Sequence, residues 1–257
     1  MPQQLAHYFD CVIPWEKRLK REMPLLEVLA RSAGRRVLVP ACGTGGHVVA
    51  LALRGFDVLG FDVDEDALVI ASERIEAAAA AIAAATGRAE LRLLEMQLAS
   101  DLGSQYGVAF VLGNALPGIS EPGQLAASLK GVAGALRPGG TLLTQNLNYD
   151  LRWREKTRFF PVLSGKTMDE EVLLVKFADY DPALINFHAM FLARPKAGGA
   201  WQSNVRSSRQ LPLFKETMTA LLTKAGFDEF QFWGDFAKNP FDPEKSPDLI
   251  IMARRRG

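Results

Sequence analysis

The chain has 257 residues, of which 48% are hydrophobic, so it can bury a sizeable core as one domain with an elaboration. A formal net charge of +1 argues against a nucleic-acid partner, whose recognition needs a concentrated basic surface. No apolar run could span a bilayer and no signal-peptide core begins the chain, so we expect a cytoplasmic protein without a membrane partner. Two distant cysteines and only three histidines predict reduced thiols and no metal site.

The first 150 residues alternate between predicted helices and predicted strands. The helices cover roughly 14–33, 46–54, 64–86 and 121–136, and the strands cover 37–40, 56–61, 90–95, 107–112 and 141–147. Strands that alternate with helices form a mostly parallel sheet covered on both faces. We therefore expect a doubly wound α/β domain, in which residues 1–33 form an N-terminal helical cap.

The second half of the chain changes character. Residues 170–212 are rich in β-branched and aromatic residues, and turn signals at 181–182 and 198–199 predict an antiparallel meander. A helix at 215–225 and strands at 227–233 and 248–253 then complete a sheet of seven strands. An insertion at 151–212 lies before the final helix, where it can cover the acceptor site as a lid. A dimer interface or a cover for a sheet edge is the alternative.

A strand, a glycine turn, a helix and a second strand ending in an acid form the most informative segment. The strand 37–40 is followed by Gly43 and Gly45, and Asp62 lies 19 residues after Gly43. Val48 occupies the third glycine position of a dinucleotide-binding loop, which disfavours an NAD-dependent oxidoreductase, and no G-K-[ST] follows to form a P-loop. A ligand with a ribose and no phosphate fits this pattern, with Asp62 accepting from the ribose hydroxyls.

These segments resemble the class I S-adenosylmethionine (SAM)-dependent methyltransferases. The matching stretches are 37–38 with 41–45, the strand 58–62, and the Leu-Arg-Pro-Gly-Gly-Thr-Leu segment at 136–142. A finer similarity to the glycine and sarcosine N-methyltransferase-like branch comes from shorter segments, at 15–18, 41–45, 112–114, 148–150, 234–236 and 246–247. The resemblance implies the Rossmann-like fold of these enzymes, SAM as the cofactor and a small molecule as methyl acceptor.

The resemblance also assigns residues around the glycine turn to the cofactor. Ala41, Gly43 and Gly45 would let the backbone approach its methionine part, because glycine has no Cβ to block a ligand. Asp62 would bind the ribose, and Val63 would pack on the adenine face.

Five further residues are assigned to the cofactor by resemblance. Gln97 falls where the family usually carries an acid for the adenine amino group, although an ordinary loop glutamine is the alternative. Leu112 and Asn114 match the segment beside the sulfonium. Trp15 and Arg18 resemble an N-terminal clamp in which the guanidinium meets the cofactor carboxylate; a surface charge is the alternative for Arg18.

Candidate acceptor-site residues follow the later strands. Asn146, Asn148 and Tyr149 lie beyond a strand's carboxyl end, where they are either acceptor contacts or turn residues. His188 is a candidate base over the pocket, with a satisfied sheet histidine as the alternative. We take Asn146, Tyr149 and His188 as the candidate catalytic residues.

Two positions depart from the family pattern. Val39 stands where the family often has an acid at the end of the first strand, and Leu147 stands where glycine N-methyltransferases have an arginine for the substrate carboxylate. Arg152, Arg206 or Arg209 could replace that arginine, or the acceptor could differ. The sequence therefore predicts a methyltransferase acting on a small molecule, favouring an amine nitrogen. A SAM-binding interaction protein without catalysis is the alternative, and the oligomeric state stays open, a homo-oligomer included.

Overall fold

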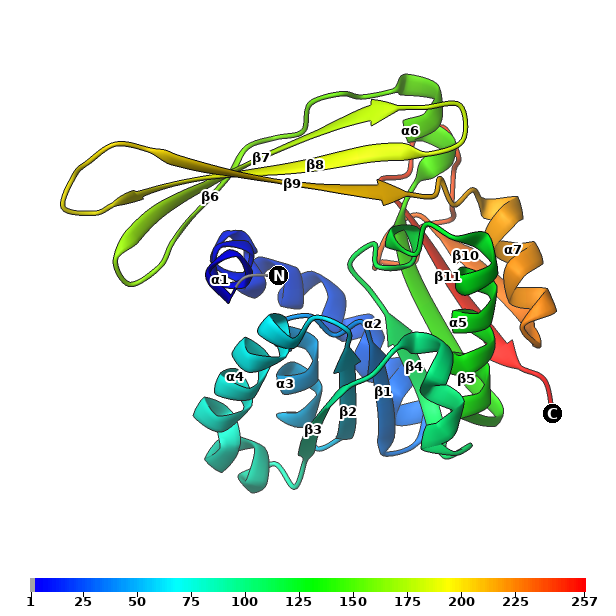
Figure 1. The fold of residues 1–257 in the computed structure, drawn as a ribbon. Coiled ribbons are helices and arrows are strands. Elements are labelled where there is room, and N and C mark those ends of the chain that lie inside the picture. The colour runs from blue at the N-terminus through cyan, green and yellow to red at the C-terminus, as the bar shows by residue number, and fades with distance from the viewer. Residues whose placement is uncertain (1–2) are drawn as a thin grey trace.

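A seven-stranded sheet with helices on both faces forms the centre of the computed structural model, which describes residues 3–257 (Figure 1). The first two residues of the expected cap lie outside the described part. The strands of this sheet are β1 (Arg36–Pro40), β2 (Asp57–Asp62), β3 (Arg88–Leu93), β4 (Tyr106–Val111), β5 (Leu136–Leu147), β10 (Phe227–Trp233) and β11 (Asp248–Arg255). Their order is β10-β11-β5-β4-β1-β2-β3. β11 runs in the opposite direction to the other six strands. The predicted fold class is confirmed.

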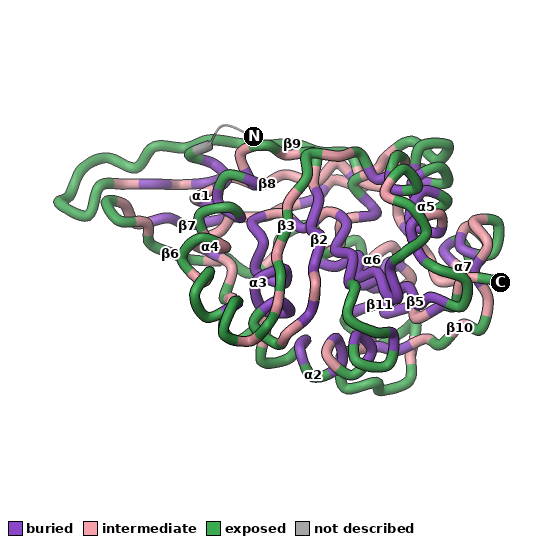
Figure 2. Tube along the Cα trace, turned by 90° about the horizontal axis from the view of Figure 1, so that it is seen from below, coloured by how far each residue is buried: buried purple, intermediate pink, exposed green. Residues whose placement is uncertain are grey.

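Helices bury both faces of this sheet because its central strands are apolar on both sides. One face carries α2 (Trp15–Ala33), α3 (Gly46–Ala52) and α4 (Glu65–Ala84), and the other carries η1 (Met96–Leu102), α5 (Pro122–Ala135) and α7 (Lys215–Lys224). Asp64 caps α4 by accepting from Ala67 N at 3.3 Å, which satisfies one free amide of the first turn. Figure 2 shows buried strands at the centre, surrounded by helices that are buried on the side facing the sheet and exposed on the outer side.

A second sheet lies across the carboxyl ends of the parallel strands (Figure 1). It is antiparallel, in the order β6 (Leu163–Lys166), β7 (Glu170–Tyr180), β8 (Ile185–Pro195) and β9 (Gln202–Gln210). Its inner face packs on α1 (Gln3–Val12) through Leu5, Tyr8, Val172 and Phe191. Alternation along the strands then places every second residue of β7 to β9 on this inner face.

Several short elements differ from the prediction. The helix predicted near 121–136 agrees with α5 to within one residue at each end, but the strand start expected near 141 is wrong, because β5 begins at Leu136. Leu136 already pairs with Tyr106, and the Pro-Gly-Gly stretch interrupts the register before pairing resumes at Thr141. The helices α1 and α6 (Tyr149–Glu155) and the turn η2 (Leu116–Gly118) were not predicted as separate elements. Within residues 3–257, no helix combines the length and apolar character needed to cross a membrane.

Candidate active site

A cavity of about 660 Å³ lies at the carboxyl ends of β1, β2 and β4, under α1. Its walls also include the start of α2, the segment before η1 and part of α5. Most of the residues predicted to contact the cofactor line this cavity: Trp15, Arg18, Ala41, Gly43, Asp62, Val63, Gln97 and Leu112. Gly45 and Asn114 are absent from its lining. Sequence reasoning therefore located this hollow, because its residues follow strand ends that meet at one edge of the sheet.

Asp62 is held rigidly at the end of β2. Its Oδ2 accepts from Gly43 N at 2.8 Å, and its Oδ1 accepts from Val63 N at 2.8 Å and Asp64 N at 3.0 Å. Burial raises the pKa of Asp62, and these amides oppose that shift. The carboxylate is thereby oriented in the cavity wall, and Oδ2, which accepts from a single amide, keeps a lone pair for a further donor.

The two predicted turn glycines have different roles. Gly43, at φ 53°, lines the cavity, and a Cβ there would meet no protein atom within 4 Å. Gly45, at φ 78°, faces α4 instead, where a Cβ would come within 2.7 Å of the Cβ of Ala71. Gly43 therefore leaves space for a ligand, whereas Gly45 leaves space for a helix.

Val48 is accommodated by a glycine on the neighbouring strand. A Cβ on Gly60 would lie 2.6 Å from Val48 Cγ2, so β2 supplies the close approach that a third loop glycine would otherwise provide. This explains how the loop keeps its shape with a branched residue at that position.

Trp15 forms the N-terminal wall of the cavity. Its ring lies against Gly46, where a Cβ would come within 2.3 Å of it. The guanidinium groups of Arg18 and Arg74 lie 5.3 and 5.2 Å from the ring centroid. Its Nε1 donates to Asp10 Oδ1 at 2.8 Å, and Asp10 also pairs with Arg74 at 2.7 Å. These contacts fix the indole next to the glycine turn, with part of the ring facing the cavity.

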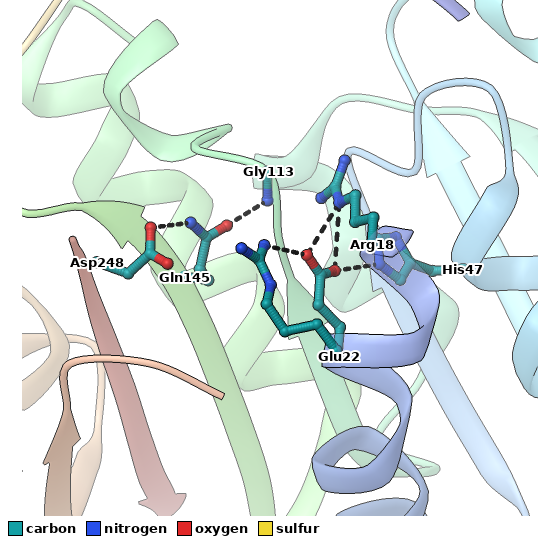
Figure 3. Close-up of polar contacts among 7 residues, drawn as sticks. Arg18, Glu22, His47, Gly113, Gln145 and Asp248 are labelled. Atoms are coloured by element: carbon teal, nitrogen blue, oxygen red, sulfur yellow. Dashed lines mark hydrogen bonds and ion pairs between the residues drawn. The ribbon is translucent and has the colours of Figure 1, made fainter. Parts of the chain in front are cut away.

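A buried carboxylate that sequence reasoning missed lies behind this wall (Figure 3). Glu22 is 1% exposed and accepts from Arg18 Nε at 3.1 and 3.2 Å, from Arg21 Nη2 at 2.9 Å and from His47 Nε2 at 2.6 Å. Burial would raise the pKa of Glu22, but the hydrogen bond from His47 and the charge of Arg18 outweigh it and hold the pKa at about 2. Burial lowers the pKa of His47, so we assign a neutral ring that donates to the carboxylate.

A second chain of hydrogen bonds fixes the turn after β4 (Figure 3). Gly113 N donates to Gln145 Oε1 at 2.8 Å, and Gln145 Nε2 donates to Asp248 Oδ1 at 2.8 Å. Gly113 lies beside Arg18, since a Cβ on this glycine would be 3.1 Å from Nη2. The Leu112–Gly113 segment therefore meets the N-terminal wall across the cavity.

Asn114 and Tyr149 lie together, outside the cavity lining. Asn114 Nδ2 donates to Tyr149 Oη at 3.0 Å and its Oδ1 accepts from Leu147 N at 2.9 Å, while Tyr149 Oη donates to Gln210 Oε1 at 3.1 Å. Burial raises the pKa of Tyr149 to about 12, so its hydroxyl stays protonated near neutral pH. This arrangement links β4, α6 and β9, and it argues against Tyr149 as a general base.

Asn146 and His188 lie apart from the cavity. Asn146 is buried, and neither of its side-chain polar atoms finds a hydrogen-bond partner among the described residues. His188 pairs across the sheet with Phe177 and Ser207, on the face opposite the one that contacts α1. Its ring stacks on Phe177 at 4.7 Å and bonds Ser207 Oγ at 2.7 Å, as a sheet histidine does. This placement argues against His188 as a base over the cavity.

Glu95 is a second acidic residue that the sequence analysis missed. It lies at the end of the cavity where the adenine is expected to bind. Glu95 lines the cavity together with Gln97, whose Nε2 donates to a Glu95 carboxylate oxygen. Val63 is 65% exposed at the same end. The position of Glu95, two residues before Gln97, was the sequence feature that could have identified it. Within residues 3–257, no group of His, Cys, Asp or Glu side chains could hold a metal ion.

These features fit SAM, the cofactor that the family resemblance implies. The cavity offers the oriented Asp62 carboxylate for hydroxyl donors, open space beside Gly43, and the Arg18 guanidinium in its lining. Hydroxyl groups, an adenine face and a carboxylate are the groups that such a set can bind.

Comparisons with known proteins agree with this fit. The family model described as thiopurine S-methyltransferase (TPMT) matches residues 6–98. A relative from Halorhodospira halochloris named Glycine/sarcosine N-methyltransferase is 25% identical over 254 residues, covering 95% of this chain and 84% of the relative.

Solved structures show the same fold. A SAM-dependent methyltransferase from Clostridium acetobutylicum ATCC 824 superposes with a TM-score of 0.77 at 13% identity, covering 99% of this chain and 98% of that one. CalS10, a SAM-bound amino pentose methyltransferase from Micromonospora echinaspora, gives a TM-score of 0.68 at 19% identity, with 91% of each chain covered. The chain therefore has the fold of the class I SAM-dependent methyltransferases, and distant relatives named Glycine/sarcosine N-methyltransferase match it over nearly its full length.

Proposed function

We propose that this enzyme transfers a methyl group from SAM to an amine nitrogen of a small molecule. The observation that carries the proposal is the cavity at the carboxyl ends of β1, β2 and β4, with the Asp62 carboxylate fixed in its wall by backbone amides. The sequence relatives that span nearly the whole chain are named Glycine/sarcosine N-methyltransferase, which supports nitrogen as the acceptor atom.

The residues of the cavity divide between the parts of the cofactor. Asp62 would accept from the ribose, Val63 would cover the adenine, and Glu95 or Gln97 would accept from its amino group. Trp15 and Arg18 would enclose the methionine carboxylate. Bound SAM supplies a methyl group already activated on a sulfonium.

The protein's remaining task is alignment of the acceptor. Well-oriented reactants can gain about 7–11 kcal/mol of the barrier from positioning alone, so an elaborate set of acids and bases is not required. A protonated amine must lose a proton before it can attack. A neutral amine attacks through its own lone pair, and the cationic product then releases a proton.

Two neighbouring cations outside the cavity lining, Arg152 and Lys176, are our candidates for binding an anionic group of the acceptor. Lys176 lies half-buried on the inner face of β7, next in alternation to Leu174 and Ala178. Burial lowers the pKa of Lys176, and the nearby charge of Arg152 lowers it further. The Arg152 guanidinium lies 4.9 Å from the ring centroid of Phe160, whose backbone N donates to Lys176 O at 3.0 Å. Neither cation forms an ion pair within residues 3–257.

Two measurements test the proposed function. Calorimetry should detect micromolar binding of SAM and of its demethylated product, S-adenosylhomocysteine (SAH). A methyl-transfer screen over small amines and their alcohol and thiol counterparts should then show transfer to the amines. Absence of micromolar binding would end the proposal, and binding without transfer to any amine would favour the non-catalytic alternative.

Substitution of either unpaired cation should reduce transfer to anionic acceptors. We expect Arg152→Gln and Lys176→Met each to lower kcat/KM at least tenfold for carboxylate-bearing amines, since a charge-assisted contact is worth about 1.5–3 kcal/mol. SAH binding should stay unchanged. Arg154→Gln is the matched control, because Arg154 is exposed and pairs with Glu244 at 3.2 Å. An equal loss with uncharged amines would rule out anion recognition here.

A further inference from the structure

We propose that Glu22 is a positioning residue, which fixes the Arg18 guanidinium so that its outer nitrogens face the carboxylate of the cofactor. The inference rests on the proposed cofactor contact of Arg18. Glu22 itself is absent from the cavity lining, so it would act only through Arg18.

The contact between these side chains leaves one edge of the guanidinium available. Arg18 donates from Nε to both oxygens of Glu22. Within residues 3–257, neither Nη1 nor Nη2 of Arg18 donates to a protein acceptor. Arg18 lines the cavity. Gly113 lies against its guanidinium, because a Cβ built on this glycine would be 3.1 Å from Arg18 Nη2. A planar guanidinium held by its Nε presents its other nitrogens as a preformed fork for a carboxylate.

The charge of Glu22 also keeps two arginines on the same side of α2. Arg18 and Arg21 both donate to this carboxylate, which is 1% exposed. Without its negative charge the two cations would repel each other, and a long arginine side chain would regain rotamers in solvent. Fixing the side chain before the ligand arrives lowers the ordering cost of binding.

His47 connects this pair to the glycine turn. It lies on the first turn of α3, directly after Gly46, and its Nε2 is 2.6 Å from Glu22 Oε2 (Figure 3). Its ring meets Trp15 edge-on, at 5.6 Å between centroids. Glu22 therefore ties the helix that carries Arg18 to the loop on which the methionine part of the cofactor would lie.

Two ligands distinguish positioning from general support of the fold. SAH carries the methionine carboxylate, whereas 5′-methylthioadenosine keeps the adenosine and lacks the amino-acid part. We expect Glu22→Gln to raise the Kd of SAH at least tenfold and to change the Kd of methylthioadenosine less than twofold, both measured by calorimetry on protein shown to be folded by thermal unfolding. In an Arg18→Gln background the same change should leave the ratio of the two constants unaltered.

The controls separate every outcome. Glu27→Gln should affect neither ligand, because Glu27 lies on the same helix and accepts from Arg31 and Arg54 away from the cavity. If Glu22→Gln does not fold, Glu22→Asp, which keeps the charge but withdraws the carboxylate from Arg18 Nε by one methylene, should give the same selective loss. Equal weakening of both ligands, or of neither, would overturn the positioning role. Failure of the unsubstituted enzyme to bind either ligand would instead overturn the proposed cofactor site.

Discussion

Asp62→Ala should weaken the binding of SAM at least tenfold. The substitution removes a carboxylate that three backbone amides orient in the cavity wall. Gly43 N and Val63 N donate to it at 2.8 Å, and Asp64 N donates at 3.0 Å. Hydrogen bonds to a charged acceptor are worth about 1.5–3 kcal/mol each, and 1.4 kcal/mol corresponds to a factor of ten in Kd. Calorimetric titration with SAM measures the change directly.

A control on the same strand separates ligand contact from damage to the sheet. Asp57 begins β2, is half-buried and pairs with Arg35 at 3.3 Å, far from the cavity lining. Asp57→Ala should leave the Kd of SAM unchanged. An unaltered Kd in Asp62→Ala would remove the ribose assignment, whereas a loss in both variants would point to the strand rather than the carboxylate.

Gly45→Ala should destabilise the protein by about 2–5 kcal/mol, the sum of a left-handed backbone and an overpacked contact. The new Cβ would lie 2.7 Å from that of Ala71, at a backbone φ of 78°. For a domain of this size the loss corresponds to a fall in Tm of roughly 4–20 °C, measurable by thermal unfolding.

Gly43→Ala provides the comparison, because its φ is also positive but its Cβ would enter open space. We expect a smaller loss of stability, about 1–2 kcal/mol, together with weaker SAM binding, since the methyl group would occupy part of the cavity. Should Gly45→Ala unfold no earlier than Gly43→Ala, the assignment of Gly45 to helix packing would be wrong.

The sequence predicted the main sheet and the position of the cavity because both depend on local patterns. Buried runs such as 37–39 read as strands, and polar or glycine residues directly after them share one edge of a parallel sheet. Asp62 was found in this way. The same logic could not separate Gly43 from Gly45, since only the packing of α4 shows which glycine faces a ligand.

Residues that act over long sequence separations escaped prediction. Glu22 looks like one of several charges on α2, and its burial depends on His47, 25 positions later. Gln145 and Asp248 meet across 103 positions. His188 was expected near the cavity, but strand register fixed the face on which it lies, and a shift by one residue would reverse that face.

The wall formed by α1 makes the shape of the cavity depend on a distant part of the chain. Ala6 and Phe9 contribute to this wall. The opposite side of α1 rests on β6 and β7, with Tyr8 Oη donating to Glu170 at 2.6 Å. Asp10 fastens the same helix to Arg74 of α4. Mutations in the outlying hairpins can therefore alter how long a cofactor stays bound, without touching any residue that contacts it.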